Sequence, residues 1–204
     1  MENRKQHWEN VFETKGPKEV SWFQEYPKTS IDYLLGLNLP KTANIIDIGG
    51  GDSNLVDALL EKGYKNLWVL DISAAALEKT KKRLGEKAKG VNWIVSDIIT
   101  FESHVKFDFW HDRAAFHFLT DELSISKYIS IVEKAIKQHG DFLLGTFSED
   151  GPLKCSGLEI KKYSEEDMKS TFSHSFAAIS CYTENHLTPF NTIQNFRFCG
   201  FKRK

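Results

Sequence analysis

A glycine-rich stretch with an acid in front of it has the clearest chemical meaning in this sequence. Residues 45–53 read Ile-Ile-Asp-Ile-Gly-Gly-Gly-Asp-Ser. Glycines directly after a predicted strand let the backbone approach a ligand closely. Asp47 lies two residues before Gly49, where a carboxylate would disfavour a pyrophosphate and suit a ligand with a cationic amino group. The alternative is that Asp47 only caps loop amides.

Two further acids follow at the predicted ends of the next two strands. Asp71 lies 22 residues after Gly49, where a carboxylate can accept both ribose hydroxyls of a nucleoside. Asp97, in the run Ser96-Asp97-Ile98, is placed to accept from an adenine amino group. Each acid alone could be a helix cap or a solvated loop residue. Together with the glycines, the acids predict a nucleoside-containing ligand at the carboxyl ends of three strands.

The dinucleotide motif G-x-G-x-x-G is the competing interpretation of the glycine turn. Gly49 and Gly51 fit this motif, but Asn54 occupies the third glycine position. Asp47 and a predicted antiparallel hairpin at the end of the chain also count against an NAD-dependent oxidoreductase. A non-catalytic binding module remains a third possibility, although an intact glycine loop with its acids disfavours it.

The predicted strand at 107–111 leads into a second candidate site. Histidine is a common general base in enzymes, and His111 could take a proton from an incoming nucleophile. Asp112 or Arg113 could orient it, bind the substrate or pair with each other. The alternative is a structural Asp112–Arg113 contact beside a core histidine. We therefore treat these three residues as the candidate catalytic set.

His117 and Cys155, later in the chain, are two further residues that we consider for this site. His117 lies one helical turn beyond this set in an apolar run, so we expect it to be an interior histidine. Cys155 belongs to the loop at 149–157 after the fifth predicted strand, on the ligand side of the sheet. We expect that loop to border the substrate pocket.

The elements that must position these residues alternate between strand and helix. Apolar runs rich in β-forming residues predict strands at 43–48, 67–70, 91–95, 107–111 and 142–147. Helical spacing of apolar residues predicts helices from 55 to Gly63, from Ser73 to about 87, and at 121–137. This alternation predicts a parallel sheet with helices on both faces. Two strands in succession, at 176–182 and 193–201, predict an antiparallel hairpin at one sheet edge.

The length of 204 residues predicts one domain, 1–204, with a helical cap at 1–40 and the sheet-bearing core at 41–204. Within the cap, Trp8, Val11 and Phe12 are at helical spacing, and 31–37 predicts another helix. Trp22-Phe23 lies between Gly16-Pro17 and Pro27. We expect this segment to cover the ligand pocket, with simple packing as the alternative.

Composition limits the classes of partner and location. Hydrophobic residues make up 41% and charged residues 27% of the chain, and the formal net charge is −1. These values predict a cytoplasmic globular protein, a monomer or weak homodimer, with no nucleic acid or membrane partner. Cys155, Cys181 and Cys199 contain no CxxC spacing, so we expect neither a disulfide framework nor a metal site.

With these motifs the sequence resembles the class I S-adenosylmethionine (SAM)-dependent methyltransferases over roughly residues 20–204. Asp47, Gly49 and Gly51 match the family's D-x-G-x-G loop, and Asp71 and Asp97 match its later cofactor positions. The resemblance implies an α/β fold with a doubly wound, Rossmann-like sheet of seven strands, mostly parallel with an antiparallel C-terminal hairpin strand. It also implies these cofactor-binding residues: Trp22, Asp47, Gly49, Gly50, Gly51, Asp71, Ile72, Asp97, Ile98 and His111.

The implied activity is transfer of a methyl group from SAM to a small molecule or a protein side chain. Small bacterial methyltransferase-domain proteins look most similar, and protein-lysine methyltransferases share a tryptophan-containing segment like Val20-Ser21-Trp22-Phe23. The chain lacks the Asn/Asp-Pro-Pro-aromatic motif after its fourth predicted strand. That absence argues against methylation of nucleobases and of glutamine or asparagine side chains.

Overall fold

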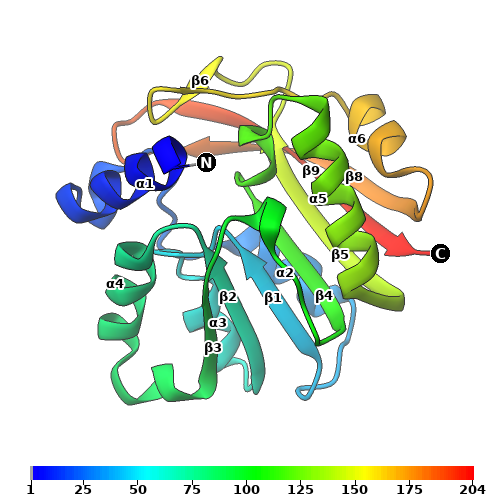
Figure 1. Ribbon diagram of the computed structural model, residues 1–204, viewed down its shortest axis with the longest axis horizontal. Helices are drawn as coiled ribbons and strands as arrows, with labels where there is room; N and C mark the ends of the chain where they lie inside the picture. Colours follow the sequence, from blue (N-terminus) through cyan, green and yellow to red (C-terminus); the bar gives the residue numbers. More distant parts are fainter. Residues whose placement is uncertain (1) are drawn as a thin grey trace.

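The computed structural model describes residues 2–204 and is built around a seven-stranded sheet (Figure 1). Its strand order is β3-β2-β1-β4-β5-β9-β8. The strands are β1 Asn44–Ile48, β2 Asn66–Asp71, β3 Val91–Val95, β4 Phe107–Arg113, β5 Ile136–Phe147, β8 Phe176–Leu187 and β9 Ile193–Arg203. Strands β1 to β5 are parallel, and β9 runs antiparallel to both β5 and β8. The predicted fold class is confirmed.

Helices cover both faces of the sheet. On one face lie α2 Lys28–Gly36, α3 Leu55–Glu61 and α4 Ala74–Leu84, and on the other lie α5 Glu122–Ala135 and α6 Glu165–Phe172. Side chains along β1 point alternately to the two faces of the sheet. Ile46 and Ile48 therefore pack toward α5, whereas Ile45 packs toward α2 and α3. Within residues 2–204, none of the helices is long and apolar enough to cross a membrane.

The first helix, α1 Glu2–Thr14, lies apart from these two layers. It crosses the carboxyl end of the sheet beside the start of α4 (Figure 1). The short elements are 3₁₀ turns at Pro17–Glu19, Gly85–Gly90, Ile98–Thr100 and Phe116–Phe118, and the small hairpin of β6 Lys154–Cys155 and β7 Leu158–Glu159. Helix α1 and the segment after it are therefore the parts of the chain placed to cover the strand ends.

Several element boundaries differ from the predicted ones, among them those of α4 and β4. Helix α4 begins after its predicted cap Ser73 but ends at Leu84, since Gly85 has φ +57° and turns the chain into a 3₁₀ helix. Strand β4 continues beyond His111 to Arg113, because Arg113 still pairs with Gly145 of β5. The second difference decides which way the candidate catalytic side chains point.

The expectation about the cysteines needs correction, because one disulfide joins Cys181 of β8 to Cys199 of β9. The two residues are opposite each other in the antiparallel register, with their Cα atoms 4.2 Å apart. Spacing along the chain could not reveal this pair, since the register of the hairpin decides which residues meet. Cys155 is a buried free thiol.

Candidate functional site

Two adjoining cavities open at the carboxyl ends of β1 to β4. They share four lining residues, Phe12, Trp22, Gly49 and Arg113. All of the predicted cofactor residues except Gly51 line one or both of them: Trp22, Asp47, Gly49, Gly50, Asp71, Ile72, Asp97, Ile98 and His111. The three strand-end acids thus surround one continuous site, as their spacing predicts.

The turn after β1 depends on a glycine in a left-handed conformation. Gly49 has φ +67°, and its amide donates to the carbonyl of Leu70 at 2.7 Å. A Cβ atom on Gly49 would lie 2.9 Å from the Cβ of Ala115 in the loop after β4. Both the backbone conformation and this close approach therefore require glycine at the junction of the two cavities.

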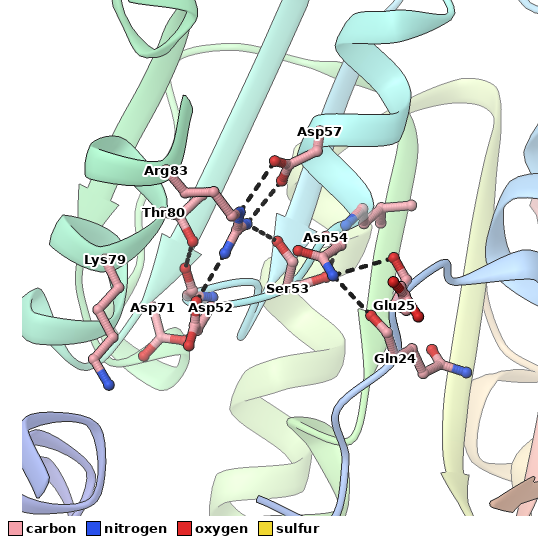
Figure 2. A network of polar contacts seen from close by, with 12 residues as sticks. Gln24, Glu25, Asp52, Ser53, Asn54, Asp57, Asp71, Lys79, Thr80 and Arg83 are labelled. Carbon is pink, nitrogen blue, oxygen red and sulfur yellow. Dashed lines mark hydrogen bonds and ion pairs between the residues drawn. The ribbon is translucent and has the colours of Figure 1, made fainter. Parts of the chain in front are cut away.

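Two side chains of helix α4 bond to the glycine loop and the residues after it (Figure 2). The guanidinium of Arg83 donates to the carboxylates of Asp52 and Asp57 and to the carbonyl of Ser53, at distances of 2.7–3.0 Å. Thr80 donates its hydroxyl to the carbonyl of Gly51 at 2.6 Å. These bonds fix the loop that a ligand must approach.

Asn54 explains why the third glycine of the dinucleotide motif is absent. Its side-chain amide donates to the carbonyls of Gln24 at 2.9 Å and of Glu25 at 3.2 Å (Figure 2). A glycine at this position has no side chain that could make these bonds. Asn54 therefore joins the glycine loop to the chain segment that covers the cavities.

Asp71 is held at the end of β2 by backbone amides. Its carboxylate accepts from the amide of Gly51 at 3.0 Å and from that of Ser73 at 2.8 Å. A Cβ atom on Gly51 would lie 2.5 Å from this carboxylate, so the glycine allows the contact. Burial raises the pKa of Asp71 to about 6, although both amide bonds oppose the shift.

Asp97 meets a residue that the sequence analysis did not single out. One oxygen of Asp97 accepts from the amide of Ile99, and the other forms an ion pair with Arg4 at 2.7 Å. Arg4, Trp8 and Phe12 all line the cavities from α1. Their spacing of four residues places them on one helix face, which is the signal that could have identified Arg4.

Glu9 fixes α1 over the site. Its carboxylate accepts from the Ser73 hydroxyl at 2.7 Å and from the amides of Ala74 and Ala75 at 2.9 and 3.0 Å. Burial would raise the pKa of Glu9, but these bonds outweigh it and lower the pKa. The carboxylate thereby completes the cap at the N-terminus of α4.

Trp22 lies at the junction of the two cavities. Side chains from distant elements hold its segment there through hydrogen bonds to the backbone. Arg113 donates to the Trp22 carbonyl at 3.0 Å, and His186 contacts the Ser21 carbonyl through Nε2 at 2.8 Å. The Trp22 ring packs edge-on against Trp8, with ring centroids 5.7 Å apart. Trp8 in turn packs against Phe118, at 5.1 Å. This part of the wall is consequently aromatic.

The candidate catalytic set is divided between the two faces of the sheet. His111 and Arg113 line the cavities, whereas Asp112 points toward α5 and is fully buried. Asp112 accepts from the amides of Ala115 and Phe116 and from the Tyr128 hydroxyl. It therefore supports the turn after β4 and does not pair with Arg113. Burial raises the pKa of Asp112 to about 6.

Both ring nitrogens of His111 are engaged inside the protein. Nδ1 lies 2.6 Å from Oδ1 of Asp47, and Nε2 lies 2.8 Å from the hydroxyl of Ser30. The other carboxylate oxygen of Asp47, Oδ2, is buried and has no partner among residues 2–204. His117 is fully buried, as predicted, and burial and then the charge of Arg113 lower its pKa to about 3.

Comparison with known proteins shows the family to which this chain belongs. A family model described as a methyltransferase domain matches residues 39–195. Together, the parallel sheet and the three acids around its carboxyl end define a protein that binds a nucleoside-containing ligand. The chain belongs to the methyltransferase domain family, whose members use SAM as methyl donor.

The names of two relatives indicate different methyl acceptors. The chain is 26% identical to eEF1A lysine methyltransferase 2 of Danio rerio, covering 69% of this chain and 66% of that protein. It is 28% identical to malonyl-[acyl-carrier protein] O-methyltransferase 2 of Ilyobacter polytropus, covering 52% of this chain and 40% of that protein. The chain thus spans less than two thirds of the length of each of these relatives.

A solved structure shares the fold at low identity. The N-methyltransferase NodS from Bradyrhizobium japonicum, in complex with S-adenosyl-L-homocysteine (SAH), superposes with a TM-score of 0.72. The alignment covers 98% of each chain at 15% identity. The unpartnered oxygen of Asp47, the close approach at Gly49 and the acid at Asp71 fit a ligand with an ammonium group and a ribose. These residues therefore fit SAM.

Proposed function

We propose that this chain transfers the methyl group of SAM to a nucleophile on a small molecule or a protein side chain. The observation that carries the proposal is the placement of Asp47, Asp71 and Asp97 around one site at the ends of β1, β2 and β3. Asp97 and Ile98 would hold the adenine, Asp71 and Ile72 the ribose. Gly49 to Gly51 would let the backbone approach the methionine part.

Bound SAM supplies an activated methyl group on a sulfonium, and the chain's residues would contribute alignment. Direct displacement needs a nucleophile in line with the methyl group, and holding the two together supplies much of the rate. The wall of the first cavity contains Trp22, Phe118, Arg113 and Cys155, and Trp22 and Arg113 also line the second. Burial raises the pKa of the Cys155 thiol to about 12, so Cys155 itself stays protonated and inert.

The catalytic part of the proposal rests on His111 and Arg113. Arg113 would contact ligand directly, because it lines both cavities. His111 would act as a positioning residue for Asp47, or as a general base if its bond to Ser30 opens. Asp112 would act only by supporting the turn that carries Ala115.

We also propose the class of acceptor, the location, the oligomeric state and the domain organisation of the protein. A net charge of −1 supports an acceptor other than nucleic acid. We also propose a cytoplasmic monomer or weak homodimer without a membrane partner. The names of the relatives, a lysine methyltransferase and a malonyl-[acyl-carrier protein] O-methyltransferase, leave both a protein side chain and another acceptor group open. We propose a single domain in which residues 1–40 form the cap and 41–204 the core.

Isothermal titration with SAM, SAH and NAD tests the cofactor assignment. We expect micromolar or tighter binding of SAM or SAH and no binding of NAD. Incubation of the protein with methyl-labelled SAM and fractionated lysate then tests the activity, because label enters either protein or small molecules. Binding of NAD without SAM or SAH would overturn the cofactor, and SAM binding without any labelled product would leave a non-catalytic binding module.

A further inference from the structure

Arg113 is the last residue of β4 and lies where the two cavities meet. Its guanidinium carbon lies 4.5 Å from the ring centroid of Phe196 in β9, so one face of the group is covered by an aromatic ring. Strand alternation places Arg113 on the same face as His111, next to the methionine side of the proposed SAM site. The side chain is therefore fixed at the border between donor and acceptor.

Most of the donors of this guanidinium are unused. Nη1 donates to the carbonyl of Trp22, but Nε and Nη2 are buried and have no hydrogen-bond partner among residues 2–204. Burial lowers the pKa of Arg113 to about 10, which still leaves the group charged at neutral pH. Glu184 is the acid that most favours this charge, but it makes no hydrogen bond to Arg113: its Oε1 accepts from Gln24, and its Oε2 is buried without a partner among residues 2–204. A buried cation with two free donors is poorly satisfied by the protein alone.

The free donors form a pair with a defined shape. Nε and Nη2 of a guanidinium point to the same side, and this edge can hold both oxygens of one carboxylate. Across the same cavity, Asp47 keeps its buried Oδ2 without a partner. Arg4 is the other arginine on the cavity walls, and it already forms an ion pair with Asp97.

We propose that Arg113 is a carboxylate-binding residue that holds a ligand carboxylate through Nε and Nη2. The carboxylate has two possible sources, the methionine part of SAM or an acidic acceptor seated beside it. In the first case Asp47 and Arg113 together recognise the ammonium and carboxylate of an amino acid. In the second case the acceptor is an acid. Both cases rest on the proposed function.

Decarboxylated SAH, S-adenosyl-3-thiopropylamine, separates the carboxylate from the rest of the cofactor. If Arg113 binds the cofactor carboxylate, the wild-type protein binds SAH more tightly than this analogue by about tenfold or more. The variant Arg113→Met loses that preference, and Arg113→Lys keeps part of it because a point charge remains. Arg4→Met is the matched control, since it removes an arginine from the adenine end and changes both affinities by the same factor.

Benzoate and its neutral counterpart benzamide test the second source in the SAH-saturated protein. If Arg113 binds an acceptor carboxylate, the wild-type complex prefers benzoate by about tenfold or more, and Arg113→Met loses this preference. Circular dichroism establishes that each variant is folded. If Arg113→Met does not fold, the two wild-type preferences decide alone.

The proposal is overturned if the wild-type protein shows neither preference, or if Arg113→Met retains those it has. In that case the unpartnered donors of Arg113 would have a role only within the protein, beside Glu184. Failure of SAH to bind the wild-type protein at all is a different result, because it would overturn the proposed function and leave the role of Arg113 without a ligand to explain it.

Discussion

His111 and Asp47 are neighbours in the parallel pairing of β1 with β4, and Nδ1 of the ring lies 2.6 Å from Oδ1 of the carboxylate. The other nitrogen of His111 contacts the hydroxyl of Ser30 in α2. A Ser-His-Asp order also occurs in catalytic triads, but Ser30 is 2% exposed and lines neither cavity. We infer that this chain of bonds holds Asp47 with Oδ2 free for a ligand ammonium.

Replacement of His111 by Ala is expected to weaken SAH binding by about tenfold, because Asp47 loses the group that orients it, and to lower the free energy of unfolding by about 1–3 kcal/mol. Titration calorimetry and chemical unfolding measure the two effects. Ser30→Ala removes only the outer bond of the chain and should change both quantities less.

A general-base role for His111 has a different signature. The maximal rate of His111→Ala would then fall by about 10²–10⁴-fold while SAH affinity stays unchanged, and the pH–rate profile would lose its acidic limb. That result would contradict the positioning role and show that the bond to Ser30 opens during catalysis.

The affinity for SAH should depend on the ionisation of Asp71. Burial raises the pKa of this acid from 3.8 to about 6, so the carboxylate becomes protonated as the pH falls from 7 towards 5. An ionised carboxylate accepts both ribose hydroxyls, and a protonated one accepts less well. We therefore expect SAH affinity to be constant above pH 7 and to fall by about tenfold near pH 5. Calorimetry across this pH range measures the effect.

Asp112 offers the matched control for that prediction. Burial also raises its pKa to about 6, but its carboxylate bonds to Tyr128 and points away from the cavities. The variant Asp112→Asn should keep the pH dependence of SAH affinity, whereas Asp71→Asn should remove it. Equal pH dependence in both variants would assign the titration to another group.

Asn54 should couple the glycine loop to the segment that carries Trp22. The variant Asn54→Gly introduces the third glycine of the dinucleotide motif but removes the hydrogen bonds to Gln24 and Glu25. We therefore expect SAH affinity to fall by about 3–10-fold. Hydrogen exchange over residues 16–28 should become faster in the variant, and SAH should slow it in the wild-type protein.

Asn66 is the matched control for Asn54. Its amide also makes two bonds, to Thr42 and Asn44, but at the amino end of the sheet, far from the cavities. The variant Asn66→Gly should leave exchange at residues 16–28 unchanged. Equal exchange in wild type and Asn54→Gly would mean that the covering segment is held without Asn54.

Glu9 should hold α1 in place over the cofactor site. The variant Glu9→Ala removes the three bonds that cap α4, which we expect to cost about 0.5–2 kcal/mol of stability. SAH affinity should fall as well, because Trp8 and Phe12 are no longer held in the cavity wall. Calorimetry measures the affinity, and the variant Glu13→Ala, at an exposed position of the same helix, should behave like the wild-type protein.

The sequence by itself determined the sheet and the three strand-end acids. Hydrophobic alternation marked the strands, and parallel strands connected by helices must end at the same edge. Asp47, Asp71 and Asp97 therefore had to lie together once their strands were recognised. The glycine turn between strand and helix was equally local, since the left-handed backbone of Gly49 by itself favours glycine.

The tertiary structure decided which of the remaining side chains reach the site. The extension of β4 to Arg113 sends His111 and Arg113 to one face and Asp112 to the other, so pairing with β5 set their roles. The contact of Arg4 with Asp97 spans 93 residues, and that of Glu9 with Ser73 spans 64. Local periodicity can place Arg4 on the cavity face of its helix, but it cannot identify the partners, because these pairs exist only when packing brings separate elements together.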